Sequence, residues 1–119
     1  MKVLGTLKPK DENHMFNQLE GYIRTFMFEG LIQVVVTDEL PKTGNSPTHV
    51  VQLVLPSGEH SKIGDAWLRT VRKGENQGNF YLSVIIDDPA FEQPLKFAIF
   101  ERGDHAVAQW KRQSISFGI

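Results

Sequence analysis

The feature that most constrains this chain is the spacing of its apolar residues. Along almost the whole sequence they either alternate with polar residues, a period of two, or fall in short unbroken runs. Leu53–Leu55 and Val84–Ile86 are typical runs. Residues at i and i+2 face the same side of a β-strand, so the pattern predicts strands. Gly, Pro, Asn, Asp and Ser fill the segments between the runs, as turns require. We find no internal repeat of fixed length.

Eight strands are predicted from this pattern, at regular spacing. They cover Val3–Lys8, Gly21–Phe28, Leu31–Thr37, His49–Leu55, Ser61–Lys73, Phe80–Ile86, Leu95–Glu101 and His105–Arg112. Asn13–Glu20 is the main window that is also compatible with a helix. Many short strands joined by turns predict an all-β fold with little helix, a single small antiparallel barrel or sandwich of about eight strands. Closure is favoured because an open sheet would leave two edges to protect.

The length of 119 residues is that of one domain, and the 40% of hydrophobic residues is enough for one core. We expect a single β domain over residues 1–112 and a short tail over residues 113–119. Apolar residues alternate in this tail, so it could pair as an edge strand with a partner or with a second copy in a homodimer. The sequence has neither a signal peptide nor an apolar run of membrane length, which predicts a soluble cytoplasmic protein.

Composition and motifs argue against several classes of function. The 13 Lys and Arg residues against 14 Asp and Glu residues exclude a strongly basic nucleic-acid binder and an acidic DNA mimic. Cys is absent, so the chain has no disulfide and no thiol nucleophile. The 4 histidines lack metal-ligand spacing, and no phosphate-binding loop or nucleophile elbow occurs. We therefore predict a non-enzymatic protein with no catalytic residue, no metal site and no cofactor.

Asp87 and Asp88 are the most prominent acidic feature. Paired carboxylates can share a proton or hold a metal ion, and with a histidine they would form the centre of a hydrolase. Adjacent strand residues point to opposite faces, however, and Asp-Asp-Pro after an apolar strand is typical of a turn. We interpret the pair mainly as turn residues, with Arg24, Arg69 and Arg112 as ion-pair partners that would fix the strand register.

An aromatic and basic set of side chains is the main candidate for a binding surface. Its members are Tyr22, Arg24, Phe26, Trp67, Arg69, Lys73 and Tyr81. Sheet faces that combine aromatic rings with Arg and Lys hold single-stranded nucleic acid by base stacking and phosphate charge. The alternative is that the rings belong to the core, with Trp67 and Trp110 as anchors of the core or of a sheet corner, and that arginine stems cover them.

Three glycines, Gly5, Gly21 and Gly64, lie within or beside predicted strands. Glycine weakens a strand unless another backbone approaches closely or the strand bends there. A β-bulge at Gly64 would change the direction in which Trp67 points.

Six segments form a recognisable set of motifs in order along residues 3–112. They are Leu4-Gly5-Thr6, Gly21-Tyr22-Ile23-Arg24-Thr25, Pro47-Thr48-His49-Val50, Ile63–Thr70, Tyr81–Phe91 and Trp110-Lys111-Arg112. Together they resemble a bacterial family known only as domain of unknown function 736. The resemblance implies a setting of plasmids, conjugative elements and phage-like islands, but no catalytic or binding residue. Residues 14–20 and 113–119 depart from the pattern of the family.

We therefore expect a small non-enzymatic binding protein of mobile-element type that acts through a protein partner, such as a host-defence or conjugation component. The alternative is a weak single-stranded nucleic-acid-binding module that uses the aromatic and basic face. A metal-dependent hydrolase at Asp87 and Asp88 is the third hypothesis. Steep salt dependence would indicate phosphate contacts, and stabilisation by metal would indicate the third hypothesis.

Overall fold

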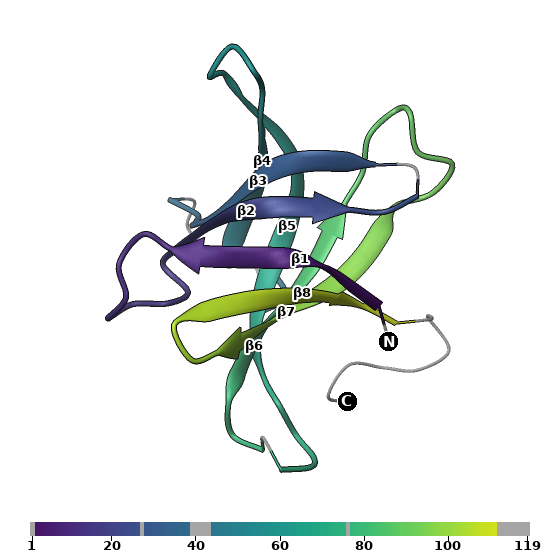
Figure 1. Cartoon of the computed structure of the whole chain (residues 1–119). Coiled ribbons are helices and arrows are strands. Elements are labelled where there is room, and N and C mark those ends of the chain that lie inside the picture. Colours follow the sequence, from purple (N-terminus) through teal and green to yellow (C-terminus); the bar gives the residue numbers. More distant parts are fainter. Residues whose placement is uncertain (1, 27, 39–43, 76, 112–119) are drawn as a thin grey trace.

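Eight antiparallel strands that close into a barrel form the fold (Figure 1). The computed structural model describes residues 2–26, 28–38, 44–75 and 77–111. The strands are β1 (Lys2–Pro9), β2 (Gln18–Arg24), β3 (Glu29–Val36), β4 (His49–Val54), β5 (His60–Thr70), β6 (Phe80–Ile86), β7 (Leu95–Arg102) and β8 (His105–Trp110). Each strand pairs with the next, and β8 pairs with β1. The all-β prediction is confirmed, and the form adopted is the barrel.

The main difference from the predicted strands concerns β2. This strand begins at Gln18 and ends at Arg24, whereas the alternation predicted Gly21–Phe28. The end of the window over residues 13–20 is therefore strand, because Leu19 pairs with Val34 of β3. The described ranges contain no helix. The predicted tail over residues 113–119 lies outside these ranges.

Side chains fill the interior of the barrel. Alternate residues of each strand point inward, and the largest of them are completely buried. These include Phe97, Leu7, Leu19, Ile23, Ile32, Leu82, Ile86 and Ile99. An eight-stranded barrel is just wide enough for side chains to fill its interior. With this core in place, a partner or ligand has to be bound on the outer wall or at the ends.

Gly21 allows β1 and β2 to pass very close to each other. A Cβ atom at this position would lie 2.8 Å from the Cα of Leu7 and would overlap the carbonyl oxygen of Thr6. Gly5 faces β2 in the same way, at the carbonyl oxygen of Tyr22. The expected close approach of backbones at these glycines is confirmed.

Gly64 allows the same close approach of backbones between β5 and β6. A Cβ atom there would lie 2.9 Å from the Cα of Ile86 and would overlap the carbonyl oxygen of Ile85. The pairing of β5 with β4 shifts register directly beside it, between Val51 and Gln52. The irregularity predicted at Gly64 is therefore present.

Aromatic residues pack against the core near both ends of the barrel. At one end, called here the Phe28 end, the rings of Phe28 and Phe91 meet edge to face with centroids 5.4 Å apart. At the other, the Phe16 end, the β1–β2 loop places Met15 and Phe16 against the core. The β2–β3, β4–β5 and β6–β7 connections lie at the Phe28 end, and the other connections lie at the Phe16 end.

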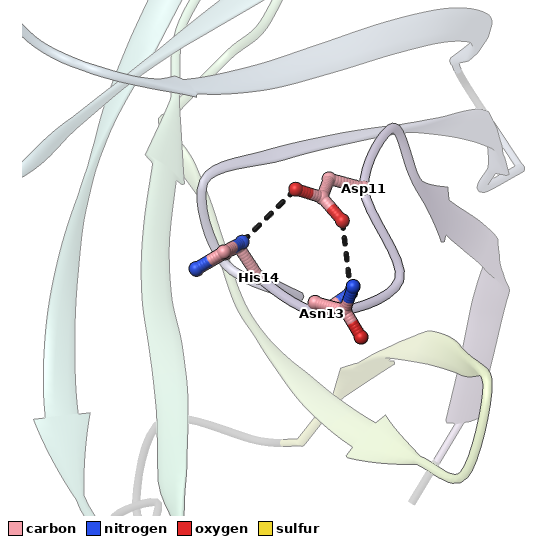
Figure 2. Close-up of polar contacts among 3 residues, drawn as sticks. All are labelled: Asp11, Asn13 and His14. Atoms are coloured by element: carbon pink, nitrogen blue, oxygen red, sulfur yellow. Dashed lines mark hydrogen bonds and ion pairs between the residues drawn. The ribbon is translucent and has the colours of Figure 1, made fainter.

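Asp11 holds the β1–β2 loop in shape (Figure 2). Its Oδ1 accepts the backbone N–H of Asn13 at 3.0 Å, and its Oδ2 lies 2.9 Å from Nδ1 of His14. The hydrogen bond with His14 and then that with Asn13 lower the pKa of the exposed Asp11 carboxyl. This turn brings the following residues, Met15 and Phe16, back onto the core.

His49 fastens the loop to the barrel. The imidazole is buried, and its Nε2 lies 2.6 Å from the carbonyl oxygen of Phe16. A carbonyl oxygen can only accept, so Nε2 carries the proton and Nδ1 accepts from the hydroxyl of Thr48 at 2.8 Å. The same hydroxyl oxygen accepts the backbone N–H of Leu68 at 2.8 Å. Residues of the loop, β4 and β5 are thus joined by one hydrogen-bonded chain.

Candidate binding surface

The residues predicted as one binding surface fall on two separate parts of the outer wall. Three belong to the β2–β3 hairpin and four to the β5–β6 hairpin, and β3 and β4 lie between β2 and β5. The two groups are Tyr22, Arg24 and Phe26, and Trp67, Arg69, Lys73 and Tyr81. The structure therefore forms two candidate surfaces instead of one.

Phe26 projects from the β2–β3 turn with 98% of its surface exposed. The residues on either side of the turn are held in place. The N–H of Thr25 donates to the carbonyl oxygen of Phe28 at 2.7 Å, and the N–H of Phe28 donates to Oγ1 of Thr25 at 3.0 Å. Phe28 itself packs on Phe91. The turn thus presents the Phe26 ring to solvent from an ordered support.

An apolar patch continues from this turn along the outer wall. Tyr22 is 64% exposed and pairs with Leu31 of β3, which in turn pairs with Val54 of β4. These side chains point away from the filled interior, because Ile23 and Ile32 beside them point inward and are buried. We call the set of Tyr22, Phe26, Leu31 and Val54 the hairpin patch.

Trp67 lies on the outer wall, half-buried, so of its two expected roles that of a core anchor is wrong. Its indole N–H donates to the carbonyl oxygen of Asn45 at 2.8 Å. Trp110, in contrast, packs against the core as expected. The Trp67 ring borders a shallow, open depression of about 330 Å³. The other residues that line this depression are Lys62, Ile63, Gly64, Asp65, Ile85 and Asp87.

Tyr81 is only 2% exposed, although it points outward from β6. Its ring stacks on that of Phe100 with centroids 5.4 Å apart and an angle of 23° between the planes. Burial raises the pKa of the Tyr81 hydroxyl, and the positive charges of Arg69 and Arg72 oppose this shift. With Val71 and Ala98 the two rings form a small second core, so Tyr81 offers no free face for stacking.

Three arginines surround this ring pair. Arg69 and Arg72 are close enough to act on Tyr81, and the guanidinium carbon of Arg102 lies 5.4 Å from the centre of the Phe100 ring. We call these residues the arginine cluster. The binding surface predicted from the sequence did not include Arg102, because Arg102 reaches the ring pair only through the pairing of β6 with β7.

Asp87 and Asp88 shape the turn after β6. Oδ1 of Asp87 accepts the N–H of Asp88 at 3.0 Å, and Oδ2 of Asp88 accepts the N–H of Ala90 at 2.8 Å. These bonds support the interpretation of the pair as turn residues. Within the described part of the chain, no three His, Cys, Asp or Glu residues are placed to hold a metal ion.

The ion pairs expected between arginines and this aspartate pair are not formed by Arg24 or Arg69. Within the described ranges Lys62 forms an ion pair with Asp65, and His14 and His105 contact Asp11 and Asp104, contacts that are ion pairs only when the imidazole is protonated. Arg112 lies outside those ranges. Within the described part of the chain, backbone pairing and the core thus set the register without an ion pair from Arg24 or Arg69.

The fold and its surfaces define the class of protein: a small closed β-barrel with a filled interior, whose candidate sites lie on its outer wall. The family model described as Protein of unknown function (DUF736) matches residues 4–113, and the chain belongs to this family. The resemblance found in the sequence motifs is thereby confirmed. No curated protein and no solved structure matches the chain. The described segments include no helix of the length and apolarity needed to cross a membrane.

Proposed function

We propose that the protein is a non-enzymatic binding protein that acts through a protein partner, and that the hairpin patch is its docking surface. The exposure of Phe26 carries this proposal, because 98% of the side chain is accessible while the turn on either side is hydrogen-bonded. An apolar ring held in this way contributes nothing to the core of its own chain. It is suited to fill a pocket in another protein.

The energetics favour an apolar partner surface. Burying a Phe side chain is worth roughly 1.5–3 kcal/mol. An aromatic side chain also loses little conformational entropy on binding, since it has only two rotatable bonds. Arg24 and Glu29, which pair across the hairpin and are both exposed, would form the polar rim of such an interface.

The partner that we propose is a host-defence or conjugation component in the cytoplasm of a bacterium that carries a mobile element. This part of the proposal rests on the family resemblance of the motifs. The proposal of a non-enzymatic role rests on the absence of catalytic motifs from the sequence.

Site-specific photo-crosslinking tests the docking surface. A benzophenone amino acid would replace Phe26, and in a control protein it would replace Val36, which is 49% exposed near the opposite, Phe16 end. After irradiation in the native host, we expect a discrete adduct from position 26 and none of the same mass from position 36. Tyr22→Ser should weaken the adduct without changing the urea midpoint of the chain.

The outcomes are distinct. An adduct with twice the mass of the chain would make the partner a second copy, as in a homodimer. Equal labelling from positions 26 and 36, or no adduct from either, would contradict docking through the hairpin patch.

A further inference from the structure

We propose that a second copy of this chain docks on the hairpin patch, in a two-fold dimer whose axis runs between β2 and β3 and parallel to them. The inference rests on the proposed function in one respect: the dimer would cover the docking surface, so that a partner has to displace the second copy. The self-association itself follows from the register of this hairpin, and it can be measured on the purified chain alone.

The β2–β3 hairpin presents four cross-strand pairs on the outside of the barrel. Their members alternate with inward-facing residues such as Ile23 and Ile32, and none of them is buried. The pairs are Gln18 with Val35, Glu20 with Gln33, Tyr22 with Leu31, and Arg24 with Glu29. The two residues of each pair lie directly opposite each other on the same face. Each pair combines two different side chains, and the last pair combines opposite charges.

A two-fold axis midway between the two strands would turn these pairs into contacts between copies. Rotation by 180° about such an axis brings the faces of two hairpins together and exchanges the positions of β2 and β3. Each residue then faces the copy of its own cross-strand neighbour, as in other isologous interfaces. Arg24 would face Glu29 of the second copy, and Tyr22 would face Leu31 of the second copy. Phe26 lies in the turn that joins the strands, near the axis, and would lie beside its own copy.

The charges on this face suit such a contact. Arg24 and Glu29 are both exposed, and the ion pairs among the described residues include neither of them. In the dimer each of the two would meet an opposite charge, and the contact would occur twice. The formal charge of the whole chain is only −1, so long-range repulsion between two copies is small.

The exposed rings set the strength of the contact. Tyr22 is 64% exposed and Phe26 is 98% exposed. Since an aromatic side chain buries about 150–250 Å² when it is fully covered, these rings would supply roughly 500–800 Å² over both copies. The neighbouring side chains of the hairpin would bring the total near the value of about 1,000 Å² above which interfaces are specific. We therefore expect a weak and reversible dimer, which a tighter-binding partner can displace.

Sedimentation velocity of the purified full chain tests the proposal. The weight-average mass should rise from that of a monomer toward that of a dimer between micromolar and millimolar concentration. Phe26→Ser should weaken association at least about tenfold, because the dimer loses the burial of two rings. Arg24→Glu and Glu29→Arg should each prevent dimerisation, because each replaces two attractive contacts between copies by two repulsive ones.

An equimolar mixture of Arg24→Glu and Glu29→Arg should recover the dimer. One copy then carries two acidic side chains at these positions and the other carries two basic ones, so both contacts between copies are attractive. Within each chain the cross-strand pair stays like-charged, so the recovery requires contacts between copies. Lys96→Glu is the matched control, since Lys96 is exposed on β7 and is separated from β2 by β8 and β1. It lowers the formal charge of −1 by two, as Arg24→Glu does, and should dimerise like the parent.

Urea midpoints would establish that every variant is folded. A monomer at every concentration, or a mixture that stays monomeric while the parent dimerises, would overturn the proposal. Loss of the dimer in Lys96→Glu would attribute the effect to net charge and would also overturn it. The photo-crosslinking experiment remains a separate test, because an adduct with another protein from position 26 would support the docking surface without any dimer. A dimer in the absence of such an adduct would support self-association alone.

Discussion

Replacing Gly64 with alanine should destabilise the barrel strongly, although the change adds a single methyl group. The new Cβ would lie 2.9 Å from the Cα of Ile86 and would overlap the carbonyl oxygen of Ile85. Both atoms belong to the backbone of β6, so they cannot rotate away as the end of a side chain could. Relief requires that β5 and β6 separate, which would disturb their pairing.

The magnitude follows from two opposing terms. Adding volume to a well-packed site costs about 1–3 kcal/mol, and contact with rigid backbone places Gly64→Ala at the upper end. The loss of glycine's freedom in the unfolded chain offsets about 0.4–1 kcal/mol. We therefore expect a net loss of about 2 kcal/mol. With a urea m-value of about 1–3 kcal/mol/M, the midpoint should fall by about 1 M.

Gly44→Ala is the matched control. No atom lies within 4 Å of a Cβ built at Gly44, and its backbone is outside the left-handed region. The remaining effect of this substitution is the reduced conformational freedom of the unfolded chain. Gly44→Ala should therefore be more stable than the parent by about 0.4–1 kcal/mol. Urea denaturation followed by tryptophan fluorescence would measure both variants. Unfolding of Gly64→Ala at the midpoint of the parent, or an equal loss of stability in Gly44→Ala, would contradict a backbone clash at Gly64.

Three further predictions concern single side chains. Burial lowers the pKa of His49 below the ordinary value of 6.5, so the unfolded chain binds a proton first. The contribution of His49 to the free energy of unfolding is therefore fully present above about pH 6.5 and falls as the pH drops toward the lower pKa of the folded state. In a series of urea midpoints measured at different pH, His49→Gln should show a weaker dependence on pH than the parent. Trp67→Phe removes the bond to Asn45 and should cost about 1 kcal/mol, and an unchanged midpoint would contradict its importance. Phe97→Ala should cost about 3–5 kcal/mol by thermal or urea unfolding, and a loss below 1 kcal/mol would contradict a filled core.

The strands and the close-approach glycines could be predicted from sequence because both depend on local rules. Alternation showed which way residues such as Tyr81 and Trp67 face relative to their neighbours. Gly64 was conspicuous because a strand interior disfavours glycine unless space demands it. Closure followed from the cost of open edges, with no knowledge of which strands would meet.

The composition of the binding surfaces could not be predicted in the same way, since it depends on contacts between distant segments. Tyr81 is covered because Phe100 of β7 stacks on it, and Trp67 is fastened to Asn45, which lies 22 residues away. Arg102 lies over the Phe100 ring, which meets Tyr81 only through the register of β6 with β7. Alternation indicates the face of a strand, but exposure depends on what the neighbouring strands and loops place above that face.

The pairing of β1 with β8 has a consequence for how the protein is made. Lys2 pairs with Trp110 and Leu7 with Ala106, so β1 remains without this partner until β8 has been synthesised. Until then the nascent chain is a sheet with two unpaired edges, which can join other chains. Closure of the barrel therefore cannot precede the synthesis of β8. A ribosome that stalls before residue 105 would release a fragment prone to aggregate, and a chaperone that shields strand edges would raise the yield of the full-length protein.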